Sequence, residues 1–368
     1  MAVLGTLFGL PEMRARLQIN LAQQGNMILL LYLGIFLATL VAGPVIDATG
    51  NKIILVTASA LVAAGMAGFA VSHSYSAATI PAVLLGLGGG GLNTSTNVLV
   101  SDLYGESRGP MLNILGIFYG IGALCIPLLA GAIEGHFAIA PQLFLCSALA
   151  AVCALLFLSM RFPPASAAQS FSWREALKVA RYPGVLLLAF VLFCQSGNEA
   201  SIGGWTSTYV GEAGLGAKAA TFILAGYWAA LMVGRLLVAR LLRTVGKIQM
   251  VLASGVGALL GAAILLTTRN QVMLVAGVLL IGLSYAGIFP TTLAIAGDAY
   301  LKFAGTVFGL LIAIALVGGM SFPWAVGHIS QASTVHYGMI VPLLGAAGIC
   351  VLAFRILSTQ RPSTKPSE

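Results

Sequence analysis

The segment Gly109–Gly131, GPMLNILGIFYGIGALCIPLLAG, is repeated 196 residues later as Gly305–Gly327, GTVFGLLIAIALVGGMSFPWAVG. Membrane helices are rich in glycine, so some glycine matches arise by chance. A Pro-x-x-x-Gly pair in both segments and an Asp-x-Tyr pair just before each are not explained that way. The same ungapped offset relates Gly50 to Gly246, Gly65 to Gly261, Gly86 to Gly282, Gly91 to Gly287, Asp102 to Asp298 and Tyr104 to Tyr300. The chain is therefore predicted to consist of two parallel repeats of six helices each.

The composition requires a membrane. The chain is 59% hydrophobic and only 8% charged, with a mean hydropathy of +1.00, whereas a soluble domain carries about 25% charged residues. Runs long enough to cross a bilayer, roughly 20 residues each, are expected at 1–17, 26–46, 53–72, 77–100, 110–132, 139–160, 184–209, 219–241, 248–267, 272–296, 304–327 and 336–356. All five cysteines lie within these runs without CxxC spacing, so we expect neither a disulfide framework nor a metal site.

The predicted fold class is an all-α membrane protein of two six-helix halves with a shortened first helix. We expect an N-terminal bundle over 1–160, a cytoplasmic linker over 161–182, a C-terminal bundle over 183–358 and a cytoplasmic tail over 359–368. Within the linker, SWREALKVAR reads as a surface helix with Ser172 as its N-cap. Residue 1 corresponds to Gly197 in the repeat, while the seventh span starts near Gly184. About thirteen residues of the first helix are thus expected to be missing upstream.

The distribution of basic residues predicts the orientation. With both termini inside, fourteen of the eighteen Lys and Arg residues fall on the inner side, and Arg14, Arg16, Lys218 and Arg269 fall outside. An excess of Lys and Arg in cytoplasmic loops is the usual topology signal of membrane proteins. The net charge of +8 therefore indicates membrane topology and not a nucleic-acid partner. We expect a multi-pass protein of the cell inner membrane.

Glu199 is the one acidic residue of ten that lies near the middle of an apolar span. An ionisable group at that depth is costly and is a functional-site hypothesis by default. The surrounding stretch, FCQSGNEASIGGWTSTYV from Phe193 to Val210, supplies the amides Gln195 and Asn198 and the indole of Trp205. This pattern predicts a small polar site inside the membrane. The alternative is that Glu199 is paired and only fixes helix packing.

The fourth span carries four consecutive glycines, Gly88 to Gly91, followed by LNTSTN. Each glycine weakens a helix by about 1 kcal/mol relative to alanine, so we expect this backbone to pack tightly against another helix. Asn93 and Asn97 are four residues apart and face the same way. They are candidate ligands for a solute, with hydrogen bonding to neighbouring helices as the alternative.

Aromatic side chains complete the predicted site. Tyr119, Tyr227 and Tyr285 are candidates to supply apolar faces, although packing explains most isolated aromatics. Trp205 lies six residues beyond Glu199, so the two would point about 120° apart on a regular helix. We expect Gly203 and Gly204 to break the helix and to turn the indole back toward the site.

The loop between the second and third spans reads GPVIDATGNK, from Gly43 to Lys52. It resembles the loop motif of the major facilitator superfamily, G-x-x-x-D-x-x-G-R-K, with Asn51 in place of the first basic residue. Gly43 would allow close helix packing and Gly50 a tight turn. Asp47 could lie on the positive end of a neighbouring helix. The resemblance implies that these three residues and Lys52 form a gate that holds one access state.

Several segments resemble one branch of this superfamily, the fucose–glucose:proton symporter family. They are GNEASIGGWTSTYV at 197–210, IFPTTLAIAGDAY at 288–300 and GTVFGLLIAIALVGGMSFPWAVG at 305–327. The resemblance implies sugar-site roles for Asn93, Asn97, Tyr119 and Glu199. Fucose symporters have a carboxylate where this chain has Asn93 and another on the first helix, where this chain is apolar near Leu7. Glu199 is therefore the remaining candidate for carrying the proton.

Together these features predict a monomeric secondary transporter that holds a hexose or deoxyhexose between its halves, with a proton, or alternatively sodium, as the coupling ion. Gln195, Asn198, Asn93 and Asn97 would bind hydroxyls through their amides. No cofactor is expected, and an enzyme is disfavoured because the spans contain no nucleophile–base pair. A drug:proton antiporter of the same fold and a non-transporting membrane sensor remain open as alternatives.

Overall fold

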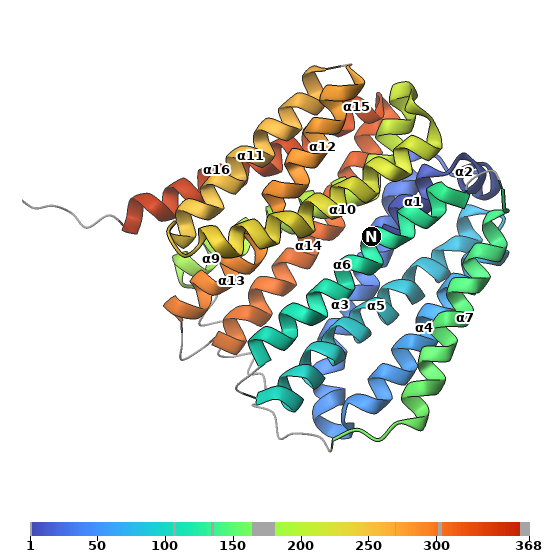
Figure 1. Cartoon of the computed structure of the whole chain (residues 1–368), viewed down its shortest axis with the longest axis horizontal. Helices are drawn as coiled ribbons and strands as arrows, with labels where there is room; N and C mark the ends of the chain where they lie inside the picture. The colour runs from blue at the N-terminus through green and yellow to red at the C-terminus, as the bar shows by residue number, and fades with distance from the viewer. Residues whose placement is uncertain are drawn as a thin grey trace, which may run out of the picture. The chain divides into compact units, whose positions relative to one another are not determined.

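The computed structural model describes residues 2–105, 108–133, 136–163, 181–268, 270–300 and 304–360. These residues form a succession of helices, and no strand occurs among them (Figure 1). The all-α fold class predicted from the sequence is confirmed. The expected surface helix SWREALKVAR and the residues from 361 onward lie outside the described residues.

The first half of the chain contains seven helices in its described part. They are α1 (Ala2–Gly9), α2 (Pro11–Leu17), α3 (Leu21–Thr49), α4 (Asn51–Val71), α5 (Tyr75–Tyr104), α6 (Arg108–Ile133) and α7 (Ile139–Ser159). The first expected span is divided at Leu10, because Pro11 at the first position of α2 starts a new helix. The first transmembrane element is accordingly two short helices.

The second half begins with α9 (Pro183–Val210), which a π-helical turn, η2 (Gly211–Leu215), joins to α10 (Gly216–Leu241). The remaining helices are α11 (Lys247–Thr267), α12 (Gln271–Tyr285), α13 (Ile288–Ala299), α14 (Ala304–Ala332), α15 (Val335–Gly338) and α16 (Ile340–Gln360). The expected span 272–296 is broken between α12 and α13. Pro290 explains this break, since a proline ring clashes with the carbonyl four residues earlier, here that of Ala286.

Ten helical segments of the described residues are long and apolar enough to cross a membrane. One of them, Pro183–Leu241, is 59 residues long and contains both the seventh and the eighth expected spans. Eleven of the twelve expected spans thus coincide with these segments to within four residues at their overhanging ends, and the first is represented by α1 and α2. The chain is a multi-pass membrane protein.

Backbone contacts divide the chain into two compact units, each of which is described here by itself. Unit 1 comprises 1–170, 203–225 and 323–338, and unit 2 comprises 171–202, 226–322 and 339–368. The end of α9 and the end of α14 therefore make their contacts within unit 1. The division into bundles at 160 and 183, with a linker and a tail, stays a prediction.

In unit 1, α5 lies between α3 and α4, and α7 packs on the other side of α4 (Figure 1). Glycines make this packing possible. A Cβ added to Gly88 would lie 2.6 Å from the carbonyl oxygen of Ala58 on α4, and one added to Gly90 would lie 2.7 Å from that of Ile35 on α3. The predicted tight packing of the glycine run is confirmed. The low helix propensity of the glycine run in α5 is offset by its close packing against α3 and α4.

In unit 2, α11 packs against both α12 and α16. The crossing of α11 and α12 is again a glycine contact, since a Cβ on Gly261 would lie 2.9 Å from the carbonyl oxygen of Gly277. Tyr285 is the last residue of α12. This arrangement fixes the helix end that faces the middle of α9.

A polar site on helix α9

Gln195 and Glu199 form the centre of the candidate site. They lie one turn apart on α9, and Gln195 Nε2 donates to Glu199 Oε2 at 3.3 Å. The same nitrogen lies 3.2 Å from the carbonyl oxygen of Tyr285 at the end of α12. This carbonyl can accept a side-chain hydrogen bond because α12 ends at Tyr285. The carbonyl therefore receives no hydrogen bond from a backbone N–H four residues later. The face of α9 that carries Glu199 is therefore turned toward α12.

The environment of Glu199 is polar but incomplete. Its side chain is half-buried, and no Lys or Arg of the described residues lies within 4.0 Å of it. Arg235 on α10 lies in the same unit as Glu199. Gln195 is fully buried, and its Oε1 has no hydrogen-bond partner among the described residues. A buried acceptor without a partner is costly, and a donor from a bound solute or a water would satisfy it.

The side-chain amide of Asn198 is hydrogen-bonded to neighbouring helices. With its amide oriented to suit its neighbours, Oδ1 accepts from the Tyr285 hydroxyl at 3.1 Å and from the Ala346 amide at 3.0 Å. Its nitrogen then lies 3.3 Å from the carbonyl oxygen of Pro342. Asn198 and Tyr285 are both fully buried. These contacts let Asn198 join α9, α12 and α16, and they favour a positioning role for it over direct contact with a solute.

Trp205 lies in different surroundings from those the glycine pair suggested. Helix α9 runs without interruption from Pro183 to Val210, so the expectation of a break at Gly203 and Gly204 is wrong. The indole is completely buried in unit 1, where its Nε1 donates to the carbonyl oxygen of Pro323 at 3.2 Å. The two glycines serve close packing instead, since a Cβ on Gly5 of α1 would lie 3.3 Å from Gly204 Cα.

The candidate residues of α5 and α6 belong to unit 1. Asn93 and Asn97 are exposed, and Asn97 Nδ2 lies 3.3 Å from Asn93 Oδ1, as expected for residues on one face. Asn97 Nδ2 also donates to the Asn93 carbonyl at 2.6 Å. Among the described residues neither amide bonds to another helix, which disfavours a role as interhelical glue. Tyr119 on α6 is 56% exposed, so more than half of its side chain is uncovered.

The structure thus groups five candidates in unit 2, namely Gln195, Asn198, Glu199, Tyr227 and Tyr285, and four in unit 1, namely Asn93, Asn97, Tyr119 and Trp205. Sequence reasoning missed Trp228, which is buried beside Tyr227 with ring centroids 5.1 Å apart. The Trp228 Nε1 has no partner among the described residues. It also missed Arg235, which was read as a topology signal only. An arginine in the same half of a helix bundle as a lone carboxyl is a signal that could have identified it.

The loop motif is only partly as expected. Gly50 lies between α3 and α4 with φ 82° and ψ 172°, a conformation essentially restricted to glycine, so the expected tight turn is confirmed. A Cβ on Gly43 would meet nothing within 4 Å, so the expected close packing at Gly43 is wrong. Asp47 is exposed in the last turn of α3 and Lys52 is half-buried at the start of α4. Their gating role stays a prediction.

The motif position Asn51 has a different use from the basic residue it replaces. Asn51 is buried, and its Oδ1 accepts from Ser95 Oγ on α5 at 2.9 Å. The matching position of the second repeat, Lys247, forms an ion pair with Asp298. The two repeats therefore stabilise the same loop in different ways, one by a buried hydrogen bond and one by an exposed ion pair.

Replacing Gly50 with alanine should destabilise the protein by about 1–3 kcal/mol, because any Cβ is strained in that backbone conformation. Gly43→Ala in the same loop segment should leave the thermal unfolding temperature unchanged or slightly raised, since the site is open and alanine is the better helix former. Thermal unfolding of the purified proteins in detergent compares the two. Equal unfolding temperatures for both variants would contradict the assignment of the turn.

The apolar helices and the internal polar cluster define a class, the polytopic helical membrane proteins that carry solutes. The family model of the Major Facilitator Superfamily matches residues 1–323, and the chain belongs to this superfamily. It is therefore a membrane transporter and not an enzyme.

Two curated relatives come from Bacillus subtilis strain 168. The uncharacterized transporter YfkL is 24% identical over 334 residues, covering 86% of this chain and 83% of that protein. The glucose/mannose transporter GlcP is 26% identical over 271 residues, covering 70% of this chain and 66% of that protein.

The solved structures of the same fold include transporters for different solutes. A nucleoside transporter, NupG, matches with a TM-score of 0.76 at 16% identity, covering 97% of this chain and 94% of that one. The fucose transporter FucP in its outward conformation matches with a TM-score of 0.65 at 20% identity, covering 96% of this chain and 97% of that one. These likenesses concern the fold.

Proposed function

We propose that the protein is a secondary active transporter for a sugar, a hexose or deoxyhexose, coupled to protons. The observation that carries this proposal is the pair formed by Gln195 and Glu199 in the middle of α9. A half-buried carboxylate beside an amide with an unpartnered oxygen offers two kinds of acceptor to the hydroxyl donors of a solute. The curated relative named as a glucose/mannose transporter supports the same solute class.

In the proposed mechanism Glu199 has two states. As a carboxylate it accepts hydrogen bonds from solute hydroxyls, and after taking up a proton it can donate one. Gln195 holds the carboxyl in place from one turn away, and its free oxygen accepts a further hydroxyl. Asn198 fixes Tyr285, and through it the end of α12 that receives Gln195. Binding and protonation would thereby be linked at one group.

Proton coupling through Glu199 also accords with the chain's departures from the fucose–glucose:proton symporter pattern. The described spans carry Asn93 on α5 and apolar side chains near Leu7 on α1, where that pattern has carboxylates. A role for Asn93, Asn97 and Tyr119 in solute binding is part of this proposal, whereas Trp205 is buried within unit 1 and bonded to Pro323. The excess of Lys and Arg on one side supports an inner-membrane location with both termini in the cytoplasm. We propose a monomer as the working unit.

A ligand screen on the purified protein tests the proposal. Thermal unfolding is measured with hexoses, deoxyhexoses, pentoses, nucleosides and a cationic dye, each at millimolar concentration. We expect a monosaccharide to raise the unfolding temperature, because a ligand at a hundred times its Kd stabilises by about 2.7 kcal/mol. Counterflow in proteoliposomes then checks that the same sugar is transported. Stabilisation and transport of nucleosides or of the dye, with no response to any monosaccharide, would contradict the proposal.

A further inference from the structure

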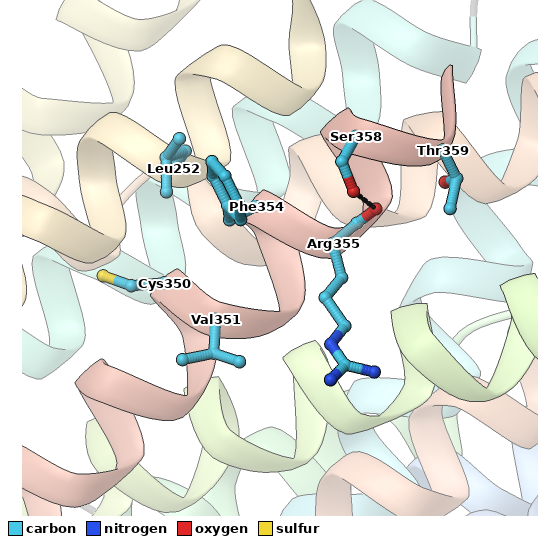
Figure 2. A pocket seen from close by; sticks show the side chains of 7 residues that line it. All are labelled: Leu252, Cys350, Val351, Phe354, Arg355, Ser358 and Thr359. Atoms are coloured by element: carbon cyan, nitrogen blue, oxygen red, sulfur yellow. Dashed lines mark hydrogen bonds between the residues drawn. The ribbon is translucent and has the colours of Figure 1, made fainter. Parts of the chain in front are cut away.

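A groove on the surface of unit 2 runs along α16 and α11. It has a volume of about 700 Å³ and is lined by Leu252 from α11 and by Cys350, Val351, Phe354, Arg355, Ser358 and Thr359 from α16. Figure 2 shows Phe354 beside Leu252 and the Arg355 side chain extending away from Ser358. The groove thus combines an apolar stretch with one cation. We propose that it binds an anionic phospholipid, with the phosphate on Arg355 and an acyl chain on the apolar residues.

The apolar stretch remains uncovered by protein. Val351 is 58% exposed and Phe354 is 63% exposed, although both lie on a helix that otherwise packs on α11. In a chain that spans a membrane, such a surface is in contact with acyl chains. A groove holds a chain more firmly than a flat helix face does, because the chain touches two helices at once.

Arg355 supplies the specificity for charge. Its guanidinium has no Asp or Glu within 4.0 Å among the described residues, and the groove is lined by no acidic side chain. A guanidinium donates two parallel hydrogen bonds to a phosphate, a geometry that lysine cannot match. Basic pockets between transmembrane helices at the cytoplasmic side are a recognised place for anionic headgroups.

The remaining charges at this end of unit 2 agree with an anionic ligand. Gly255 of α11 faces Cys350, its Cβ position lying 3.1 Å from the Sγ, and Leu252 lines the groove with Phe354. The two helices are therefore antiparallel, and the first turn of α11 lies toward the end of α16. There Lys247 pairs with Asp298, so that carboxylate does not compete for Arg355. In the sequence, Arg361 and Lys365 follow with no acidic residue before Glu368.

The hydroxyls near Arg355 are committed to the helix. Ser358 Oγ donates to the Arg355 carbonyl at 2.8 Å and Thr359 Oγ1 donates to the Ile356 carbonyl at 2.9 Å. Each hydroxyl oxygen keeps its lone pairs, so neither supplies a second donor to the phosphate in this arrangement. The preference for an anionic over a zwitterionic headgroup therefore depends on Arg355.

The test uses the purified full-length protein and two lipids with identical oleoyl chains, phosphatidylglycerol and phosphatidylcholine. Retention of each lipid is measured by native mass spectrometry over a titration. We expect phosphatidylglycerol to bind more tightly, because the guanidinium repels the choline ammonium of phosphatidylcholine. Arg355→Gln should weaken phosphatidylglycerol about fivefold, the effect of one basic group near an anionic lipid, and should weaken phosphatidylcholine less. Arg240→Gln on α10 is the matched control, since Arg240 is exposed near the end of its helix but does not line the groove.

Three outcomes would overturn the proposal. Equal retention of the two lipids by the wild-type protein would remove the preference for an anionic headgroup. An unchanged preference in Arg355→Gln, or an equal loss in Arg240→Gln, would remove the site. Displacement of phosphatidylglycerol by an equal concentration of glycerol 1-phosphate would identify a site for a free phosphate ester and not for a lipid.

Discussion

Glu199→Gln is expected to abolish the accumulation of sugar that a pH gradient drives in proteoliposomes, while exchange of labelled for unlabelled sugar continues. Glutamine keeps the hydrogen-bonding shape of the side chain but cannot take up a proton. For one proton per sugar, each unit of pH gradient supports up to about tenfold accumulation, since tenfold corresponds to 1.4 kcal/mol. The variant should therefore bring the sugar only to equal concentrations inside and outside the proteoliposomes. Uptake with and without the gradient measures the difference.

Glu212→Gln provides the control for this experiment. Glu212 lies in η2, its side chain is 41% exposed, and its carboxylate is 3.9 Å from Arg14 of unit 1, so it is a carboxyl outside the α9 cluster. The Glu212→Gln variant should retain the accumulation of sugar that a pH gradient drives. If Glu199→Gln accumulates sugar as the wild type does, Glu199 is not the proton carrier. Loss of exchange together with accumulation would contradict the prediction that glutamine keeps the sugar contacts of Glu199.

The second large effect is expected from Gly86→Ala in α5. Alanine normally favours a helix over glycine by about 1 kcal/mol, but a Cβ at Gly86 collides with the carbonyl oxygen of Leu31 on α3. The same Cβ would lie 2.9 Å from the Leu31 carbonyl carbon and 3.0 Å from Gly34 Cα. These are backbone atoms of a packed helix, so α3 and α5 must separate. A loss of about 1–3 kcal/mol of stability follows from such overpacking.

Gly89→Ala separates this steric effect from helix propensity. A Cβ at Gly89, three residues away on the same helix, meets nothing within 4 Å. The same substitution should therefore raise the unfolding temperature slightly at 89 and lower it strongly at 86. Thermal unfolding followed by size-exclusion chromatography gives both values. A destabilised Gly89→Ala or a tolerated Gly86→Ala would show that close approach to α3 is not what the glycine provides.

Much of the fold could be predicted because membrane insertion imposes long apolar helices. The composition sufficed for the all-α class, and hydropathy located eleven of the twelve expected spans in the described part of the chain. The divisions at Leu10 and between α12 and α13 were not predicted, although Pro11 and Pro290 mark both in the sequence. Hydropathy does not register a helix break, since a proline inside an apolar run hardly changes the average. Prolines alone do not locate the breaks either, because Pro44, Pro81, Pro127 and Pro323 lie inside continuous helices.

The site was predicted less completely, because contacts between helices decide what a polar residue does. The sequence grouped Gln195 with Glu199 in one polar site, and the structure shows the two side chains in contact. The sequence could not indicate that the Asn198 side chain is hydrogen-bonded to Tyr285 and Ala346. It also misled at Gly203 and Gly204, where glycines favour a bend in isolation. Helix α9 is continuous there, and α1 packs against the two glycines.

The most direct test of the central claim is chemical modification of Glu199 by a hydrophobic carbodiimide, which reacts with protonated carboxyl groups in apolar surroundings. The extent of labelling is measured by mass spectrometry of the peptide that contains Glu199, with and without the transported sugar. If the proton and the sugar bind at the same carboxyl, Glu199 should be labelled. The sugar should then protect Glu199 in proportion to the fraction of protein that has sugar bound. Labelling of Glu199 that is unaffected by a saturating concentration of that sugar would contradict the account.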